Sequence, residues 1–149
     1  MLSKKPHLKR VSLEIFGGCN YTCSMCPQST GRGKDFTRKM SLKTFKNVLD
    51  KLAPYGKPTI GLSGSGEATM AKDLPDYIRE IKSRDLKVYI KTNGAKLTGK
   101  YMQEIINAGI DLIRFSIIGY NKEKYIHWMD VDNFSLVKSN IKETIDYIK

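Results

Sequence analysis

Strand-like and helix-like segments alternate four times along this chain of 149 residues. Short apolar runs that suit strands lie at residues 11–16, 59–62, 87–91 and 112–118. Amphipathic stretches follow at residues 42–52, 74–81, 98–106 and 134–148, the last after a short helical turn at 122–128. Strands that alternate with helices form parallel sheets with right-handed crossovers. The pattern predicts an α/β fold with parallel strands and one domain spanning residues 1–149.

Composition narrows the class of protein. Hydrophobic residues make up 40% of the chain, which excludes wholesale disorder. No run approaches the ~18 apolar residues that a membrane helix needs. The basic first ten residues are not followed by the apolar segment of a signal peptide. We therefore expect a cytoplasmic protein with no membrane partner.

The chain is strongly basic, with 26 Lys and Arg against 15 Asp and Glu and a net charge of +11. Such an excess favours anionic partners such as nucleic acid or nucleotides. Most of the lysines are scattered over predicted helical faces, so a solvated surface explains the charge equally well. Arg32 and Arg38, in one of the basic clusters, are candidates to face an anionic substrate, with a solvated role as the alternative.

The connection between the first strand and its helix, residues 17–40, is far longer than the usual ~2–6 residues and is expected to be functional. It holds all three cysteines, Cys19, Cys23 and Cys26. An odd number so closely spaced is a poor disulfide framework and indicates a metal or cluster site. Three thiolates on a four-iron cluster leave one iron open to a small molecule. The alternatives are a zinc site completed by His7 or His127, or three thiols without a metal.

The CxxxCxxC spacing after a first strand resembles the radical S-adenosylmethionine (radical SAM) superfamily, and the resemblance extends over residues 8–149. It implies that the three cysteines hold a [4Fe–4S] cluster whose free iron chelates the amino and carboxylate groups of SAM. It also implies reductive cleavage of SAM to a 5′-deoxyadenosyl radical, which abstracts hydrogen from a substrate. A flavodoxin-like or ferredoxin-like electron donor is then expected.

Three further segments carry the resemblance. Gly64-Ser65-Gly66-Glu67, after the second strand, is similar to the family's Gly-Gly-Glu stretch, whose backbone meets the methionyl ammonium. Exposed carbonyls and one carboxylate suit such a cation. Thr92 and Asn93 begin a TNG segment that borders the SAM and substrate pocket in cofactor-maturation and peptide-maturation relatives. Ser116 matches a serine near the SAM ribose.

The sequence departs from the family pattern at several positions. Met25 stands where an aromatic residue usually packs near the adenine, and a thioether can fill that space. Ala68 replaces the usual proline after the Gly-Gly-Glu stretch, and Ile118 replaces an aspartate. A charged role at position 118 is therefore not carried over.

The resemblance implies a radical SAM enzyme of peptide, protein or cofactor maturation, acting on an unidentified peptide, small molecule or RNA. The alternatives are an RNA-modifying radical SAM enzyme and a non-catalytic iron–sulfur or zinc-binding remnant. His127 and Tyr120 are candidates for the substrate side, against a surface or packing role.

The family core has six strand–helix units in a partial (β/α) barrel, and about four are visible here. A sheet that ends at its fourth strand leaves an unpaired edge and uncovered apolar surface. We therefore expect the core to be short at its C-terminus. Either the chain is a fragment, or it self-associates or binds a partner that covers the edge.

Overall fold

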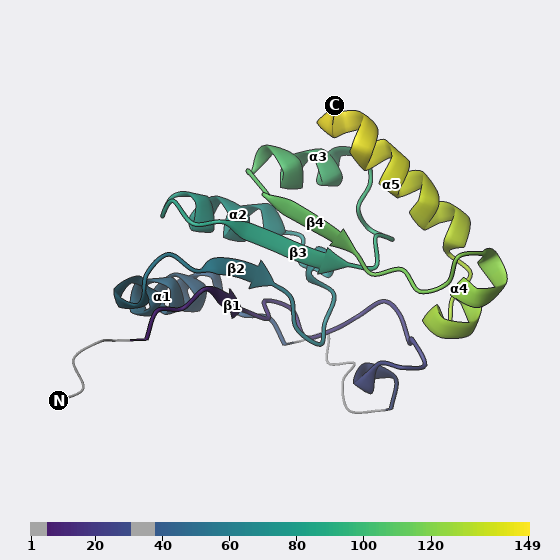
Figure 1. The fold of residues 1–149 in the computed structure, drawn as a ribbon, viewed down its shortest axis with the longest axis horizontal. Helices are drawn as coiled ribbons and strands as arrows, with labels where there is room; N and C mark the ends of the chain where they lie inside the picture. The colour runs from purple at the N-terminus through teal and green to yellow at the C-terminus, as the bar shows by residue number, and fades with distance from the viewer. Residues whose placement is uncertain (1–5, 31–37) are drawn as a thin grey trace.

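The computed structural model describes residues 6–30 and 38–149. Within these residues four strands form one parallel sheet in chain order, which confirms the predicted α/β class (Figure 1). The strands are β1 (Arg10–Ser12), β2 (Thr59–Leu62), β3 (Val88–Thr92) and β4 (Leu112–Phe115). Because neighbouring strands are parallel, their carboxyl ends meet at one edge of the sheet.

Helices follow the strands as the periodicity predicts. They are α1 (Leu42–Leu52), α2 (Leu74–Lys82), α3 (Gly99–Asn107), α4 (Lys122–Met129) and α5 (Phe134–Ile148). Short 3₁₀ turns, which the sequence did not indicate, lie at η1 (Pro27–Thr30), η2 (Ala53–Tyr55) and η3 (Ala68–Met70). The α5 helix lies beside α3, where the carboxylate of Glu143 accepts a hydrogen bond from the N–H of Gly99 at 2.8 Å (Figure 1).

The core lies between the sheet and the helices α1–α3. Ile60 and Leu62 of β2 and Val88 and Ile90 of β3 are completely buried in it. Burying an aliphatic side chain of this size contributes roughly 1.5–3 kcal/mol. Because side chains alternate along a strand, the residues between these four point to the opposite face of the sheet.

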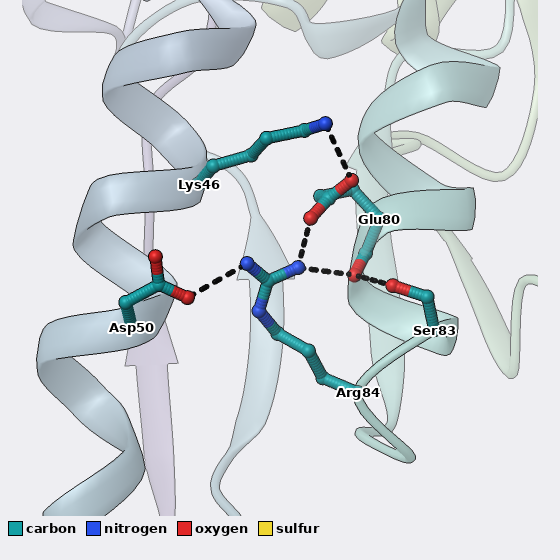
Figure 2. A network of polar contacts seen from close by, with 5 residues as sticks. All are labelled: Lys46, Asp50, Glu80, Ser83 and Arg84. Atoms are coloured by element: carbon teal, nitrogen blue, oxygen red, sulfur yellow. Dashed lines mark hydrogen bonds and ion pairs between the residues drawn. The ribbon is translucent and has the colours of Figure 1, made fainter.

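A polar network joins α1 to α2 on the outside of the core (Figure 2). Glu80 accepts hydrogen bonds from Arg84 and from Lys46, and Arg84 also donates to Asp50 at 2.8 Å. Burial of the Glu80 carboxyl acts to raise its pKa, but the bonds from Arg84 and Lys46 together hold the pKa below its usual value. The network thus keeps two neighbouring crossover helices together.

The first and fourth strands are shorter than predicted, because apolar alternation continues after the sheet pairing ends. After β1 one more bond joins Leu13 N to Gly61 O, and the chain then bends and changes partner, with Ile15 O accepting from Met40 N at 3.0 Å. After β4 the pairing continues for one bond, from Ser116 N to Thr92 O at 2.7 Å. Residues 117–118 are therefore not strand.

The free edge of the sheet has the features that the sequence led us to expect. Among the described residues β4 pairs only with β3. Leu112, Ile145 and Ile148 are exposed apolar residues near this edge. Coverage of the edge by a second copy or a partner remains a prediction. In the described part of the chain, none of the helices is long and apolar enough to cross a membrane.

Candidate functional site

The three cysteines line one hollow of about 450 Å³ at the carboxyl edge of the sheet. Cys19, Cys23 and Cys26 are all free and partly exposed. A tight turn connects the last two, with the N–H of Cys26 donating to the carbonyl of Cys23 at 2.9 Å. The long connection after β1 thus brings its thiols to a common cavity.

Burial raises the pKa of the Cys19 and Cys23 thiols above the usual value, and nearby thiols add to the effect. The N–H of Tyr21 and the side-chain amide of Asn93 point to Cys19 Sγ, at 3.5 and 3.9 Å, and act in the opposite direction. Metal binding requires thiolates. Binding of a metal here would therefore release protons.

The loop after β2 forms a second wall and packs directly on the start of the cysteine segment. The N–H of Glu67 donates to the carbonyl of Gly18 at 2.8 Å. A Cβ on Gly66 would collide with the carbonyl oxygen of Phe16, so only glycine fits at this approach. Gly64, Gly66 and Glu67 line the hollow.

Glu67 is nevertheless buried, and its carboxylate is engaged by the protein. One oxygen accepts from the backbone N–H and the hydroxyl of Thr69, at 3.0 and 2.7 Å. The other accepts from the N–H of Asn93 at 2.8 Å. The Glu67 carboxylate, which the sequence suggested as a partner of the SAM ammonium, thus instead joins two loops of the cavity.

The third wall comes from the ends of β3 and β4. Thr92, Asn93 and Ser116 line the hollow with the loop after β2. Asn93 is buried, and its amide donates to the side-chain oxygen of Asn20 at 2.9 Å. Segments predicted separately from three motifs therefore surround one cavity.

Helix α4 and the turn after it support the cysteine segment from outside. The hydroxyls of Tyr21 and Tyr125 are 3.0 Å apart, and the amide of Asn133 donates to Tyr21 at 3.1 Å. Burial raises the pKa of Tyr125, so its hydroxyl stays neutral. The sulfur of Met129 lies 4.0 Å from Cys23 Sγ. Tyr21 and Met129 also line the hollow.

Comparison with known proteins identifies the family. The Radical SAM superfamily model matches residues 13–149. The chain belongs to the radical SAM superfamily. Members of this superfamily use a [4Fe–4S] cluster and SAM. In this chain the three cysteines lie at the carboxyl edge of the sheet.

Individual radical SAM relatives agree with this assignment. The chain is 30% identical over 140 residues to a probable GTP 3′,8-cyclase of Methanococcus maripaludis strain C5, covering 93% of the chain and 46% of the relative. It is 32% identical over 111 residues to the tungsten-containing aldehyde ferredoxin oxidoreductase cofactor-modifying protein of Pyrococcus furiosus, covering 74% and 31%. The chain thus spans less than half the length of each relative.

The fold is also that of a solved radical SAM structure. The structure of tagged anSMEcpe with bound AdoMet superposes with a TM-score of 0.73 at 20% identity, over 96% of this chain and 42% of that one. At this identity the likeness shows the fold. The sheet seen here is thus a partial radical SAM barrel.

The donor set of the hollow fits an iron–sulfur cluster by its chemistry. Three free thiols face one cavity, and in a four-iron cluster each thiolate binds a different iron. By contrast, among residues 6–30 and 38–149 no group of three or more His, Cys, Asp or Glu side chains is arranged to hold a single metal ion. His7 and His127, offered above for zinc, do not line the hollow.

Two predicted SAM contacts lie at the margin of the cavity. Met25 is 43% exposed and does not line the hollow. Ser65 is exposed, and its N–H donates to the carboxylate of Glu14. Both belong to the segments that carry the radical SAM resemblance, so their contacts with SAM remain predictions.

The candidate substrate residues lie outside the hollow. Tyr120 is 86% exposed, and His127 is exposed against the ring of Trp128 at 5.0 Å between centroids. Arg38 is exposed and does not line the hollow. Arg32 falls outside the residues that the structure describes.

Several residues of the cavity were missed in the sequence. Ser12, Ser63 and Lys91 line it from the strands or their ends, and Glu14 accepts from the N–H of Gly66 at 3.1 Å. The alternation within the strands could have indicated Ser12 and Lys91, because they occupy the phase opposite to the buried residues.

Proposed function

We propose that this chain is the core of a radical SAM enzyme that matures a cofactor, with the three cysteines holding the cluster. The arrangement that carries the proposal is the single hollow shared by the cysteine segment and the loops after β2 and β3. When bound, a [4Fe–4S] cluster and SAM supply reductive cleavage of SAM and a 5′-deoxyadenosyl radical that abstracts hydrogen.

The residues of the chain bind and orient these groups. Cys19, Cys23 and Cys26 are the cluster ligands in this proposal, and Asn93 donates toward the sulfur of Cys19. Such an outer hydrogen bond orients a ligand and tunes its electron donation. The backbone carbonyls around Gly64 and Gly66 suit the SAM ammonium, and Ser116 suits its ribose.

Cofactor maturation is favoured over peptide modification by the names of the relatives. One acts on GTP by its name, and another is named as a cofactor-modifying protein. The whole enzyme's substrate and its one-electron donor are part of the proposal. Peptide maturation is the second candidate, because the radical SAM structures with the same fold include SuiB bound to its precursor peptide SuiA.

Anaerobic reconstitution tests the proposal. The protein should take up four irons and four sulfides, and with dithionite and SAM it should release 5′-deoxyadenosine and methionine. Stoichiometric zinc with no uptake of iron would show a zinc-binding remnant instead. Iron uptake without 5′-deoxyadenosine would indicate a non-catalytic iron–sulfur module.

A further inference from the structure

Two cations stand side by side on the open face of the sheet, next to the cysteine hollow. Lys91 of β3 is in register with Arg114 of β4. Adjacent parallel partners point to the same face, here the one opposite α1–α3. Lys91 lines the cysteine hollow, while Arg114 lines a second hollow of about 350 Å³ together with Arg10. The second hollow is otherwise lined mainly by the first residues of the strands, such as Arg10 and Thr59, so the pair lines two separate hollows along one face of the sheet.

Arg114 is held in place by an aromatic ring. Its guanidinium carbon lies 5.6 Å from the centroid of the Tyr89 ring, a cation–π contact. Gly61 leaves room for that ring, because a Cβ there would overlap it. The contact restrains the guanidinium beside the ring, and the N–H donors of a guanidinium suit a phosphate or carboxylate ligand.

The positive charge of this pair is not neutralised by the described part of the protein. Neither Lys91 nor Arg114 forms an ion pair with a residue that the structure describes. Asp111 also lines the second hollow, but its carboxylate accepts from Lys82 and from the N–H of Val88, both at 2.8 Å. The nearby acid is thus already occupied.

We propose that Arg114 and Lys91 bind a phosphate or carboxylate group of the substrate, while its reacting part lies in the cysteine hollow. This rests on the proposed function. Arginine binds such groups with two parallel hydrogen bonds, and lysine adds a compact charge. Hollows of about 350 and 450 Å³ are of the size that accepts small molecules. The substrate is therefore a small anionic molecule.

The test uses calorimetric titration of the cluster-free protein at fixed ionic strength, with pyrophosphate and with tricarballylate as separate probes. Arg114→Gln should weaken binding of at least one probe about tenfold, because it removes a charged hydrogen-bond donor. Lys91→Gln should weaken it less. Arg114→Lys should recover part of the loss, which separates charge from a folding defect.

Matched controls remove the same charge from the helical side of the molecule. Arg79→Gln on α2 and Lys51→Gln on α1 should bind the probes as the unmodified protein does. If they weaken binding equally, the anions respond only to the net charge of +11 and the proposal is wrong. A stronger response to pyrophosphate assigns the group as phosphate, and the reverse assigns carboxylate.

A separate measurement distinguishes this inference from the proposed function. If Arg114→Gln lowers SAM affinity as much as probe affinity, the pair binds the SAM carboxylate and the inference fails. Absence of 5′-deoxyadenosine from the reconstituted unmodified protein would reject the proposed function, while the result with the anion probes would stand.

Discussion

The carboxylate of Glu67 accepts a hydrogen bond from the backbone N–H of Asn93 at 2.8 Å, which ties the loop after β2 to the loop after β3. Its other oxygen accepts from the N–H and the hydroxyl of Thr69, within η3. Both loops line the cavity proposed for SAM. Glu67 is therefore a positioning residue in our proposal, and the backbone that it fixes meets the ligand.

Replacing Glu67 by glutamine tests this role. A glutamine amide has only one acceptor oxygen, so at least one buried donor loses its partner. We expect a loss of about 1–3 kcal/mol in the free energy of unfolding and weaker SAM binding, measured by urea unfolding and SAM titration. Glu104→Gln on α3, where Lys100 lies 3.9 Å away, is the matched control. Equal behaviour of the two variants would contradict the role.

Removing any one of the three cysteines should abolish stable cluster formation, because two thiolates rarely hold a four-iron cluster with an open iron. The measurement is iron and sulfide content after reconstitution of each Cys→Ala variant. Ser24→Ala is the control within the same turn, since its hydroxyl donates to the carbonyl of Trp128, at 3.4 Å. Full iron content in Cys23→Ala would reject Cys23 as a ligand.

No auxiliary cluster is expected on this chain, because no cysteine follows Cys26. Iron above four per chain after reconstitution would contradict this expectation unless two chains share a cluster. Mass measurement by light scattering on the same sample distinguishes the two cases.

The hydroxyl of Tyr125 should stabilise the cysteine segment. Tyr125→Phe removes the 3.0 Å contact with Tyr21 and should lower the free energy of unfolding by about 1 kcal/mol. Labelling of the Cys23 thiol in the cluster-free protein should become faster. Tyr120→Phe, at a position 86% exposed, should change neither quantity. Unchanged labelling in Tyr125→Phe would show that α4 does not restrain the segment.

The Glu80 network predicts a pH dependence of stability. The pKa of Glu80 is below its usual value in the folded protein, so its contribution is complete above the unfolded pKa of about 4.3 and is lost as the pH falls through the folded pKa. Glu80→Gln should lower the free energy of unfolding by about 1.5 kcal/mol at neutral pH. Below pH ~4 the stability of this variant should fall less steeply with pH than that of the unmodified protein. Glu123→Gln on α4 is the control. If Glu80→Gln loses stability on acidification as steeply as the unmodified protein does, the role assigned to Glu80 is wrong.

The fold was predictable because its signals are local. The helices begin where the periodicity indicates, and Ser41 caps α1 as an N-cap serine should, accepting from Thr44 N at 3.1 Å. The three cavity segments were predictable from short motifs that resemble those of radical SAM enzymes. These signals depend on neighbours in sequence and need no knowledge of distant contacts.

The missed features depend on packing between distant segments. Nothing near Glu14 in sequence indicates that its carboxylate accepts from the loop after β2, 52 positions further along. The burial of the Glu67 carboxylate similarly depends on the position of the Asn93 N–H, which donates to it. The role proposed for Arg114 likewise depends on its contact with Tyr89, for whose ring Gly61 leaves room.

The pairing of Tyr21 with Tyr125 joins residues 104 positions apart, and Thr22 also reaches Asp130, with 2.7 Å between their oxygens. A chain made from its N-terminus therefore emerges with its thiols long before the helix that closes over them. Contacts so distant in sequence form late, because closing a long loop is entropically costly. If the cysteines hold a cluster, as we propose, iron and sulfide would have the least obstructed access to them before α4 docks. The proposed loading of the cluster would thus precede the closing contacts between the cysteine segment and α4.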